Sequence, residues 1–270
     1  MNKKGRAIQF FSVFHESRLA SAKSIRRKLL KHDRYNRSKQ FYGIGSIVFC
    51  EMSRDFTHGL ISELNRFVIN VHHADCWVRA ADNFPKNEKA GILWEFADPF
   101  LELSVGRAYS IKNFFAFAAV HLLNQANVRS KKAKDEIPPD RNISFEYLVK
   151  SQMGAGWKSF PLFLEAINKL NDKAFLTATR NYRNLVQHRF RPHFHTGLTT
   201  FFDRIEENGK VSYTYKAMSP MRPEIVISEL YRQHEIAREG FQAFWNLTEE
   251  LAIDFTKKPA TKNPEIVFKS

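Results

Sequence analysis

The chain has few of the residues that mark disulfide-stabilised, fibrous or low-complexity proteins. Its 270 residues include two cysteines, Cys50 and Cys76, which are too few for a disulfide framework in a chain of this length. With 11 glycines and 10 prolines, the composition excludes collagen-like and Gly/Pro-rich low-complexity structure. We expect both cysteines to be buried and reduced, as small apolar residues are in the cytosol.

Long apolar segments are also missing. The nearest candidate, Phe114 to Leu123, contains His121 and is shorter than the roughly 18 residues that a membrane-spanning helix needs. The basic N-terminus is not followed by the apolar run and cleavage site of a secretory signal. These absences predict a cytoplasmic protein without a membrane partner.

Aromatic residues and positive charge, in contrast, are plentiful. Hydrophobic residues make up 43% of the chain and include 25 phenylalanines, enough to bury one large core or two smaller ones. The net charge is +14, and residues 1–42 contribute 12 Lys or Arg against Glu16 and Asp33. Such a bias favours a polyanionic partner, nucleic acid or an anionic membrane surface, although a solvated basic helix would show the same pattern.

The spacing of apolar residues predicts a mostly helical chain. Apolar side chains recur every three or four residues through four long segments, which is typical of amphipathic and buried helices. A break is expected at Asp98-Pro99, because the residue before a proline disfavours the helical conformation. The predicted helices cover about residues 5–32, 46–81, 90–127 and 224–255, with shorter ones at 163–170 and from Asn171-Asp172 to about 189.

A change to alternating apolar residues marks a β-hairpin at residues 198–217. The two runs flank Asn208-Gly209, a dipeptide typical of tight hairpin turns. The predicted fold is therefore an all-α antiparallel helical bundle with one inserted β-hairpin. We divide the chain into a basic N-terminal arm (1–45), which could lie on the body, a partner or RNA, the bundle (46–256), and a polar tail (257–270).

On a helical wheel, residues 175–191 form two contrasting faces. At about 100° per residue, one face is apolar and should pack on the bundle. The other face has two arginines and no carboxylate to pair with them. The apolar face holds Phe175, Ala178, Tyr182, Leu185 and Val186, and the polar face holds Arg180, Arg183, Asn184, Gln187 and His188.

These polar residues suit metal-independent cleavage of RNA. The reaction needs a base for the ribose 2′-OH, an acid for the leaving 5′ oxygen, and a cation for the phosphoryl oxygens. Histidine, present as His188, suits proton transfer because the unperturbed pKa of its side chain lies near neutrality, and Arg183 can donate two hydrogen bonds to one phosphate. Asn184 could orient either residue or bind the phosphate. One helix has one histidine near one arginine, whereas the reaction needs both a base and an acid. Catalysis therefore predicts a two-fold dimer, which brings two histidines and two arginines into a shared cleft.

The segment Arg183-Asn184-Leu-Val-Gln-His188 resembles the R-x4-6-H signature of the HEPN superfamily. The resemblance covers residues 46–255, by helix order and this motif. It implies a helical, usually dimeric, metal-independent ribonuclease of the kind found in toxin–antitoxin, CRISPR-linked and anti-phage systems. It further implies that Arg183 and His188 are catalytic and face each other across the dimer interface, and that Asn184 is the polar residue that follows the motif arginine.

One position departs from a subgroup of that family. In HEPN toxins paired with a nucleotidyltransferase antitoxin, a tyrosine two residues after the histidine is modified. Phe190 occupies this position and has no hydroxyl group, which excludes control by modification at this residue.

The leading hypothesis is thus a homodimeric endoribonuclease, a toxin or anti-phage effector that uses no cofactor or metal. Its partners would be RNA and an antitoxin or defence protein, and its products would carry a 2′,3′-cyclic phosphate or 3′-phosphate and a 5′-hydroxyl. The basic faces near the motif would bind the RNA. Candidate RNA-binding residues are Arg180, Gln187, Arg189, Arg191, His193 and His195.

Two alternatives remain open at this point. The same basic faces could belong to a non-catalytic module that binds RNA or a partner protein. A metal-dependent enzyme could instead use the segment from His72 to Cys76, because these two residues lie one helical turn apart. Two ligands do not make a structural zinc site, however, and no HExxH motif occurs, so we predict no metal.

Overall fold

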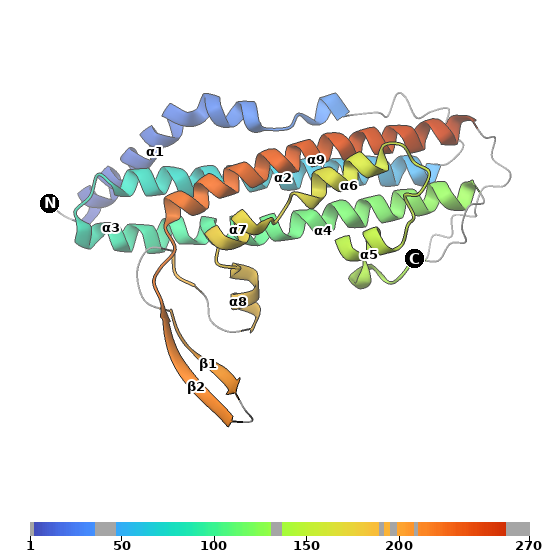
Figure 1. Ribbon diagram of the computed structural model, residues 1–270. Coiled ribbons are helices and arrows are strands. Elements are labelled where there is room, and N and C mark those ends of the chain that lie inside the picture. The colour runs from blue at the N-terminus through green and yellow to red at the C-terminus, as the bar shows by residue number, and fades with distance from the viewer. Residues whose placement is uncertain are drawn as a thin grey trace, which may run out of the picture. The chain divides into compact units, whose positions relative to one another are not determined.

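The computed structural model describes residues 3–35, 47–130, 137–188, 192–194, 199–207 and 210–257. Within these residues the chain is mostly helical, with one two-stranded antiparallel sheet (Figure 1). This confirms the predicted all-α fold with a β-hairpin. None of the described helices combines the length and apolar character that crossing a membrane requires.

Contacts divide the chain into two compact units, each built from three stretches. The first unit comprises Met1–Leu29, Asn65–Tyr109 and Asn171–Glu235, and the second comprises Leu30–Leu64, Ser110–Leu170 and Ile236–Ser270. Three long helices contribute residues to both units. These are α2 (Ile47–Ala81), α4 (Asp98–Arg129) and α9 (Pro223–Lys257), close to the predicted bounds.

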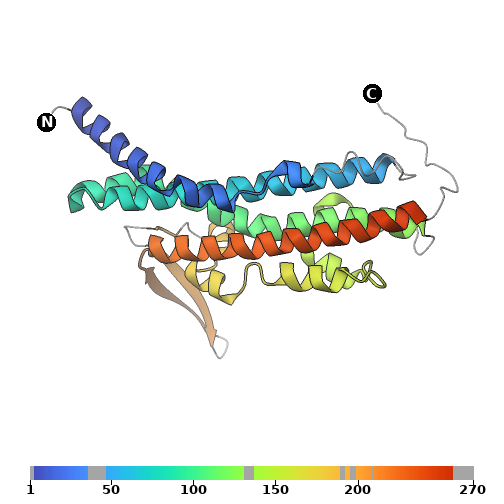
Figure 2. The same ribbon diagram turned by 90° about the horizontal axis from the view of Figure 1, so that it is seen from above.

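In the first unit, helix α1 (Lys3–Lys28) packs its apolar stripe on the body of the protein. The ring of Phe14 stacks on Trp77 of α2 with 3.9 Å between centroids, and Phe11 meets Trp77 and Phe96 edge-on. In Figure 2 the later turns of α1 lie against the C-terminal half of α2. Basic side chains of α1 stay exposed, namely Arg18, Lys23, Arg26 and Arg27.

The break predicted at Asp98-Pro99 takes a milder form. Helix α3 (Lys86–Ile92) continues into a π-helical turn, η2 (Leu93–Ala97), and then into α4. Pro99 has no backbone N–H to donate to the preceding turn. The wider turn directly before α4 accommodates this loss, so the chain changes its helical pitch and does not leave the helix.

The second unit has an aromatic centre formed by Phe115 of α4, Phe163 of α6 (Phe160–Asn168) and Phe244 of α9. All three are buried, with ring centroids 6.0–6.3 Å apart. Glu250 of α9 accepts hydrogen bonds from the backbone N–H groups of Lys158 and Ser159, which satisfies donors at the start of α6. A helix that was not predicted, α5 (Phe145–Lys150), begins at Ser144, whose hydroxyl accepts from the N–H of Tyr147. The remaining short elements of this unit are the 3-10 turns η1 (His32–Tyr35) and η3 (Asp140–Asn142).

The helix predicted from Asn171-Asp172 to about 189 is interrupted, which corrects the sequence interpretation. Asp172 caps α7 (Lys173–Ala178) as expected, accepting from the N–H of Phe175. The chain then adopts left-handed conformations at Arg180 (φ 51°) and Asn181 (φ 52°) before α8 (Tyr182–His188) begins. Asn181 tolerates this conformation, and its N–H bonds back to the carbonyl of Leu176, the pattern that ends helices.

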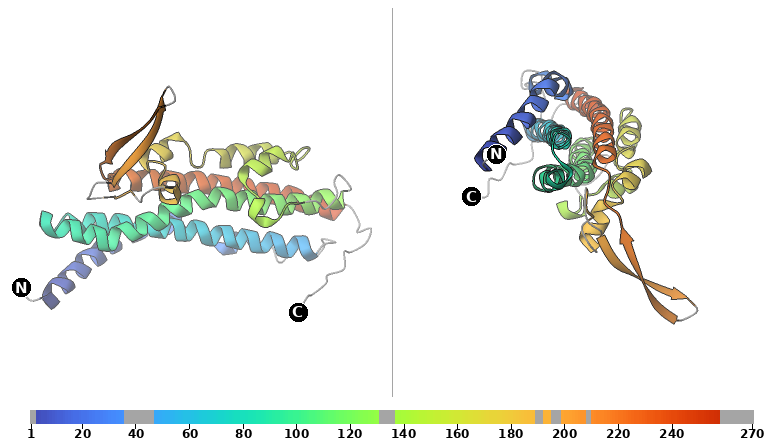
Figure 3. Two further views of the ribbon diagram at one scale, coloured as in Figure 1. Left: turned by 90° about the horizontal axis from the view of Figure 1, so that it is seen from below. Right: turned by 90° about the vertical axis from the view of Figure 1, so that its left-hand side faces the viewer.

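The hairpin matches its predicted position, with strands β1 (Thr199–Glu207) and β2 (Lys210–Met218). The pairing is antiparallel and places Phe202 opposite Tyr215 and Arg204 opposite Tyr213. Figure 3 shows the hairpin as a twisted ribbon that extends away from the helices of the first unit. Among the described residues no further strand joins it, so the hairpin has neither a third strand nor a helix packed along its length.

Candidate nucleic-acid interface

Helix α8, which carries the motif, is anchored to the first unit through Tyr182. The Tyr182 side chain is buried and its ring lies 5.5 Å from that of Phe194. Burial, together with the nearby carboxylate of Asp98, raises the pKa of Tyr182 to about 12, so the phenol stays neutral. One buried tyrosine at the start of the helix thus holds a short segment in which Arg183, Asn184 and Val186 are exposed.

Arg183 and Asn184 are both exposed on α8, next to each other in the chain. Among the described residues, no carboxylate forms an ion pair with Arg183. An arginine without a carboxylate partner on an exposed helix keeps its five donors available for an anion. The structure therefore presents the motif arginine and the residue after it to solvent.

The remaining motif residues are placed by the backbone alone. Gln187 and His188 belong to α8, and their side chains lie outside the described residues. A spacing of five residues corresponds to a rotation of about 140° and a rise of about 7.5 Å along a helix. Positions 183 and 188 are therefore separated around the helix axis. With this separation, a single helix does not bring the arginine and the histidine side chains to the same phosphate.

Arg180 has a different environment from the one predicted for it. Because the helix is interrupted, Arg180 does not share a continuous helical face with Arg183. Its guanidinium donates to the carbonyl oxygens of Ser219 and Pro220, where the chain leaves the hairpin. Arg180 therefore ties the turn between α7 and α8 to the base of the hairpin, and its contact with RNA stays a prediction.

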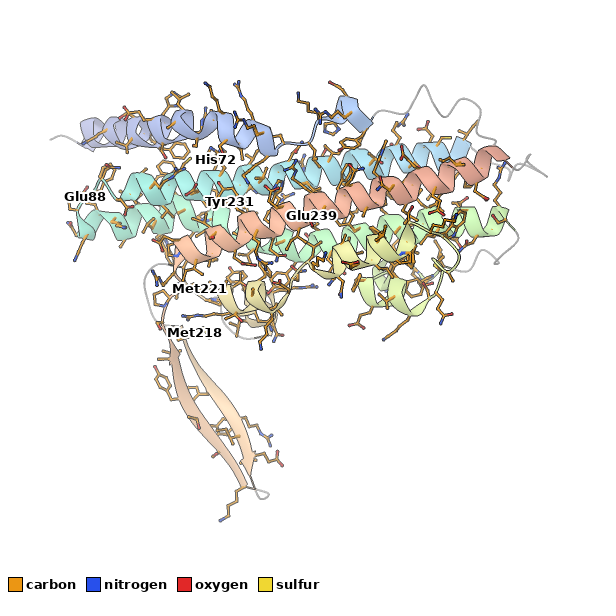
Figure 4. All side chains as sticks on the ribbon, turned by 45° about the horizontal axis from the view of Figure 1, so that its top comes forward. His72, Glu88, Met218, Met221, Tyr231 and Glu239 are labelled. Atoms are coloured by element: carbon orange, nitrogen blue, oxygen red, sulfur yellow. The ribbon has the colours of Figure 1, made fainter. Side chains whose placement is uncertain are left out.

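Of the other predicted RNA-binding residues, His193 is described. It lies in the loop at residues 192–194, with its ring 5.7 Å from that of Trp94. Its carbonyl accepts from the N–H of Met221, which Figure 4 shows near the base of the hairpin. The predicted contacts from Arg189, Arg191 and His195 lie outside the described residues.

Sequence reasoning used the hairpin as a structural element and missed what it exposes. Phe202, Tyr213 and Tyr215 are 67%, 68% and 60% exposed, respectively. Aromatic residues at alternating positions predict a buried strand face when a core is available. The signal that could have indicated otherwise is the absence of a third strand nearby in the sequence to build that core.

The His72–Cys76 segment lies in a buried polar cluster of the first unit. The Nε2 atom of His72 is 3.4 Å from the Ser21 hydroxyl, and the Cys76 sulfur is 3.7 Å from the same nitrogen. Asp75 binds Arg79 and accepts a hydrogen bond from Tyr231 of α9. Figure 4 marks the positions of His72 and Tyr231. In the part of the chain that is described, no three His, Cys, Asp or Glu side chains are grouped so that they could hold a metal ion.

This cluster makes stability depend on pH. Burial lowers the pKa of His72 to about 4, with His73, Arg79 and Arg18 adding repulsion. The folded pKa lies below the unfolded value near 6.5, so the neutral imidazole stabilises the fold fully above pH 6.5. That contribution is lost as pH falls from 6.5 towards 4, by about 3 kcal/mol.

We expect His72→Gln to flatten the fall in unfolding free energy between about pH 7 and about pH 4, as measured by urea denaturation. Glutamine cannot take up the proton, so this variant lacks the linkage. Asparagine in place of the exposed His15 is the matched control and should leave the pH profile unchanged. Equal slopes for wild type and His72→Gln would show that His72 does not cause the dependence.

Comparison with models of known families, with curated proteins and with solved structures found no match for this chain.

Proposed function

We propose that this protein is a metal-independent endoribonuclease that acts as a homodimer through Arg183, Asn184 and His188. The observation that supports the proposal is the placement of the motif on α8. Tyr182 anchors this helix, while Arg183 and Asn184 are exposed without an ion pair to a described carboxylate. A catalytic arginine must reach a phosphate from outside, and an exposed guanidinium without a carboxylate partner is able to do so.

In the proposed reaction, His188 removes the proton from a ribose 2′-OH. The freed oxygen attacks the adjacent phosphorus, and the bond to the 5′ oxygen breaks. The partner subunit's His188 protonates that leaving oxygen, so one proton is taken and one is delivered. Arg183 donates two hydrogen bonds to the non-bridging oxygens, where negative charge accumulates, and Asn184 supplies a further amide donor.

Two chains are needed because a single imidazole cannot be base and acid in the same step. A two-fold axis near α8 supplies both imidazoles and both guanidiniums to one phosphate. Two copies of Arg183 repel each other unless an anion lies between them. RNA is therefore expected to strengthen the dimer, because the phosphate neutralises this repulsion.

Affinity for RNA of any sequence would come from the rest of the basic surface. The exposed arginines and lysine of α1 suit contacts with phosphates, which release counterions and make binding weaken with salt. The proposed setting is a toxin or anti-phage effector, with an antitoxin or defence protein as a further partner.

The proposal is tested by incubating the purified protein with total RNA in excess EDTA. We expect cleavage that leaves a 5′-hydroxyl and a 2′,3′-cyclic phosphate, and its loss in His188→Ala, because that variant can neither take nor deliver the proton. Cleavage that EDTA abolishes would contradict the proposal and indicate metal-dependent chemistry. Binding of RNA without any cleavage would indicate a non-catalytic module.

A further inference from the structure

The exposed aromatic side chains of the hairpin share one face. In the antiparallel register, Phe202 lies opposite Tyr215, Arg204 opposite Tyr213, and Glu206 opposite Val211. Side chains alternate along a strand, so these six residues project from the same side of the ribbon. We call them the aromatic face of the hairpin.

This face is open to solvent over its whole length. Phe202, Tyr213 and Tyr215 are each at least 60% exposed, and Val211 is 46% exposed. The rings of Phe202 and Tyr215 contact each other edge-on, with centroids 5.4 Å apart. Arg204 forms an ion pair with Glu206 at 2.9 Å and remains about half exposed.

Nothing described in the first unit explains why these aromatic side chains are exposed. A two-stranded hairpin is marginally stable in water, and large aromatic side chains usually stabilise a strand by packing against another layer. No described element of the first unit lies over these rings, and Figure 4 shows the strands projecting beyond the base at Met218. A row of exposed rings on a protruding hairpin is typical of a surface that binds a partner.

Positive charge beside the hairpin favours one class of partner. The two strands themselves are neutral, with Arg204, Lys210 and Lys216 against Asp203, Glu206 and Glu207, and the excess of positive charge belongs to residues that flank them in the chain. Lys210 and Arg222 are exposed, as is Arg183 on α8. A single-stranded polyanion with flat aromatic groups complements both these flanking cations and the rings of the aromatic face.

We infer that the aromatic face of the hairpin is a stacking platform for unpaired bases of single-stranded RNA. The choice of RNA rests on the proposed function, and the inference adds how the enzyme would recognise its substrate. Bases in a duplex already stack on each other and hide their faces, so tyrosine and phenylalanine rings select unpaired nucleotides. Arg204 can add a cation–π or phosphate contact beside Tyr213.

The test measures binding of the full-length protein to fluorescent oligonucleotides of about 12 residues, the size range of single-strand sites. The probes are 2′-O-methyl oligouridine, which cannot be cleaved through its 2′ oxygen, and a duplex of the same length. We expect Tyr213→Ala and Tyr215→Ala each to weaken single-strand binding about tenfold, and Tyr213→Phe to keep it, because phenylalanine also stacks.

Ser212→Ala is the matched control, since Ser212 is exposed on β2 and projects from the opposite face. We expect it to bind like wild type, and we expect duplex binding to be nearly unchanged in every variant. Equal single-strand affinity in wild type and both alanine variants would overturn the inference. A changed oligomeric state in sedimentation, with RNA affinity unchanged, would overturn it too and show that the face contacts protein.

Failure of this inference can be told apart from failure of the proposed function. Loss of oligouridine binding in the hairpin variants supports the platform even if the wild type cleaves no RNA. Cleavage that depends on His188 supports the nuclease even if the hairpin variants bind RNA normally.

Discussion

Replacing Arg183 by alanine is expected to slow RNA cleavage by about 10²- to 10³-fold at saturating RNA, the usual cost of losing a donor to a developing oxyanion. The proposed role of Arg183 is to hold the phosphoryl oxygens as negative charge accumulates on them. Because this interaction strengthens in the transition state, the loss should fall on the rate constant more than on the Michaelis constant. Single-turnover measurements with a labelled oligonucleotide in EDTA would show it.

Two control variants separate this role from general basic charge. Arg183→Lys keeps the charge and loses the planar pair of donors, so it should recover little activity. Arg222→Ala removes another exposed arginine of the first unit and should weaken RNA binding with little effect on the single-turnover rate. Equal rate constants for wild type and Arg183→Ala would remove Arg183 from the reaction, and an equal loss in Arg222→Ala would indicate a purely electrostatic effect.

Phe163→Ala is expected to lower the free energy of unfolding by about 3–5 kcal/mol, the cost of deleting a buried phenylalanine. The Phe163 side chain is fully buried in the second unit, between Phe115 and Phe244. Alanine leaves a cavity that three helices must close, and close packing resists such relaxation. The midpoint of urea unfolding, followed by circular dichroism, measures the change.

Leu162→Ala provides the matched control for this substitution. Leu162 precedes Phe163 on α6 and is 66% exposed. Its truncation should change the unfolding free energy by less than about 0.5 kcal/mol, because little apolar area returns to water. If both variants unfolded at the wild-type midpoint, Phe163 would not be part of a tightly packed centre.

The motif helix shows why the candidate site could be predicted only in part. The residues of α8 and the cap at Asp172 follow from local preferences that act within a few residues. The interruption at Arg180 and Asn181 does not, because the continuous helix and the broken one differ by a few hydrogen bonds within the turn. Contacts from outside the helix, including the bonds from Arg180 to the carbonyls of Ser219 and Pro220, favour the broken form.

The hairpin illustrates the same division for a surface. Its two strands follow from the alternation on either side of Asn208-Gly209, and the structure confirms them, while the turn residues lie outside the described residues. Whether the aromatic residues are buried or exposed depends on the presence of another layer over them. A pattern of period two contains no information about that layer, so the exposure of Phe202, Tyr213 and Tyr215 became visible only in the folded unit.

The amino-acid sequence by itself determined the helical character, the hairpin, the excess of positive charge and the motif from Arg183 to His188. These properties depend on local backbone preferences and on composition, which do not change with the surroundings. Only the folded structure shows which polar side chains already have hydrogen-bond partners. Arg183 is exposed on α8, whereas the guanidinium of Arg180 donates to backbone carbonyl oxygens. Which side chains are buried, and which form hydrogen bonds, depends on residues that are distant in the chain. These residues come into contact only when the chain folds.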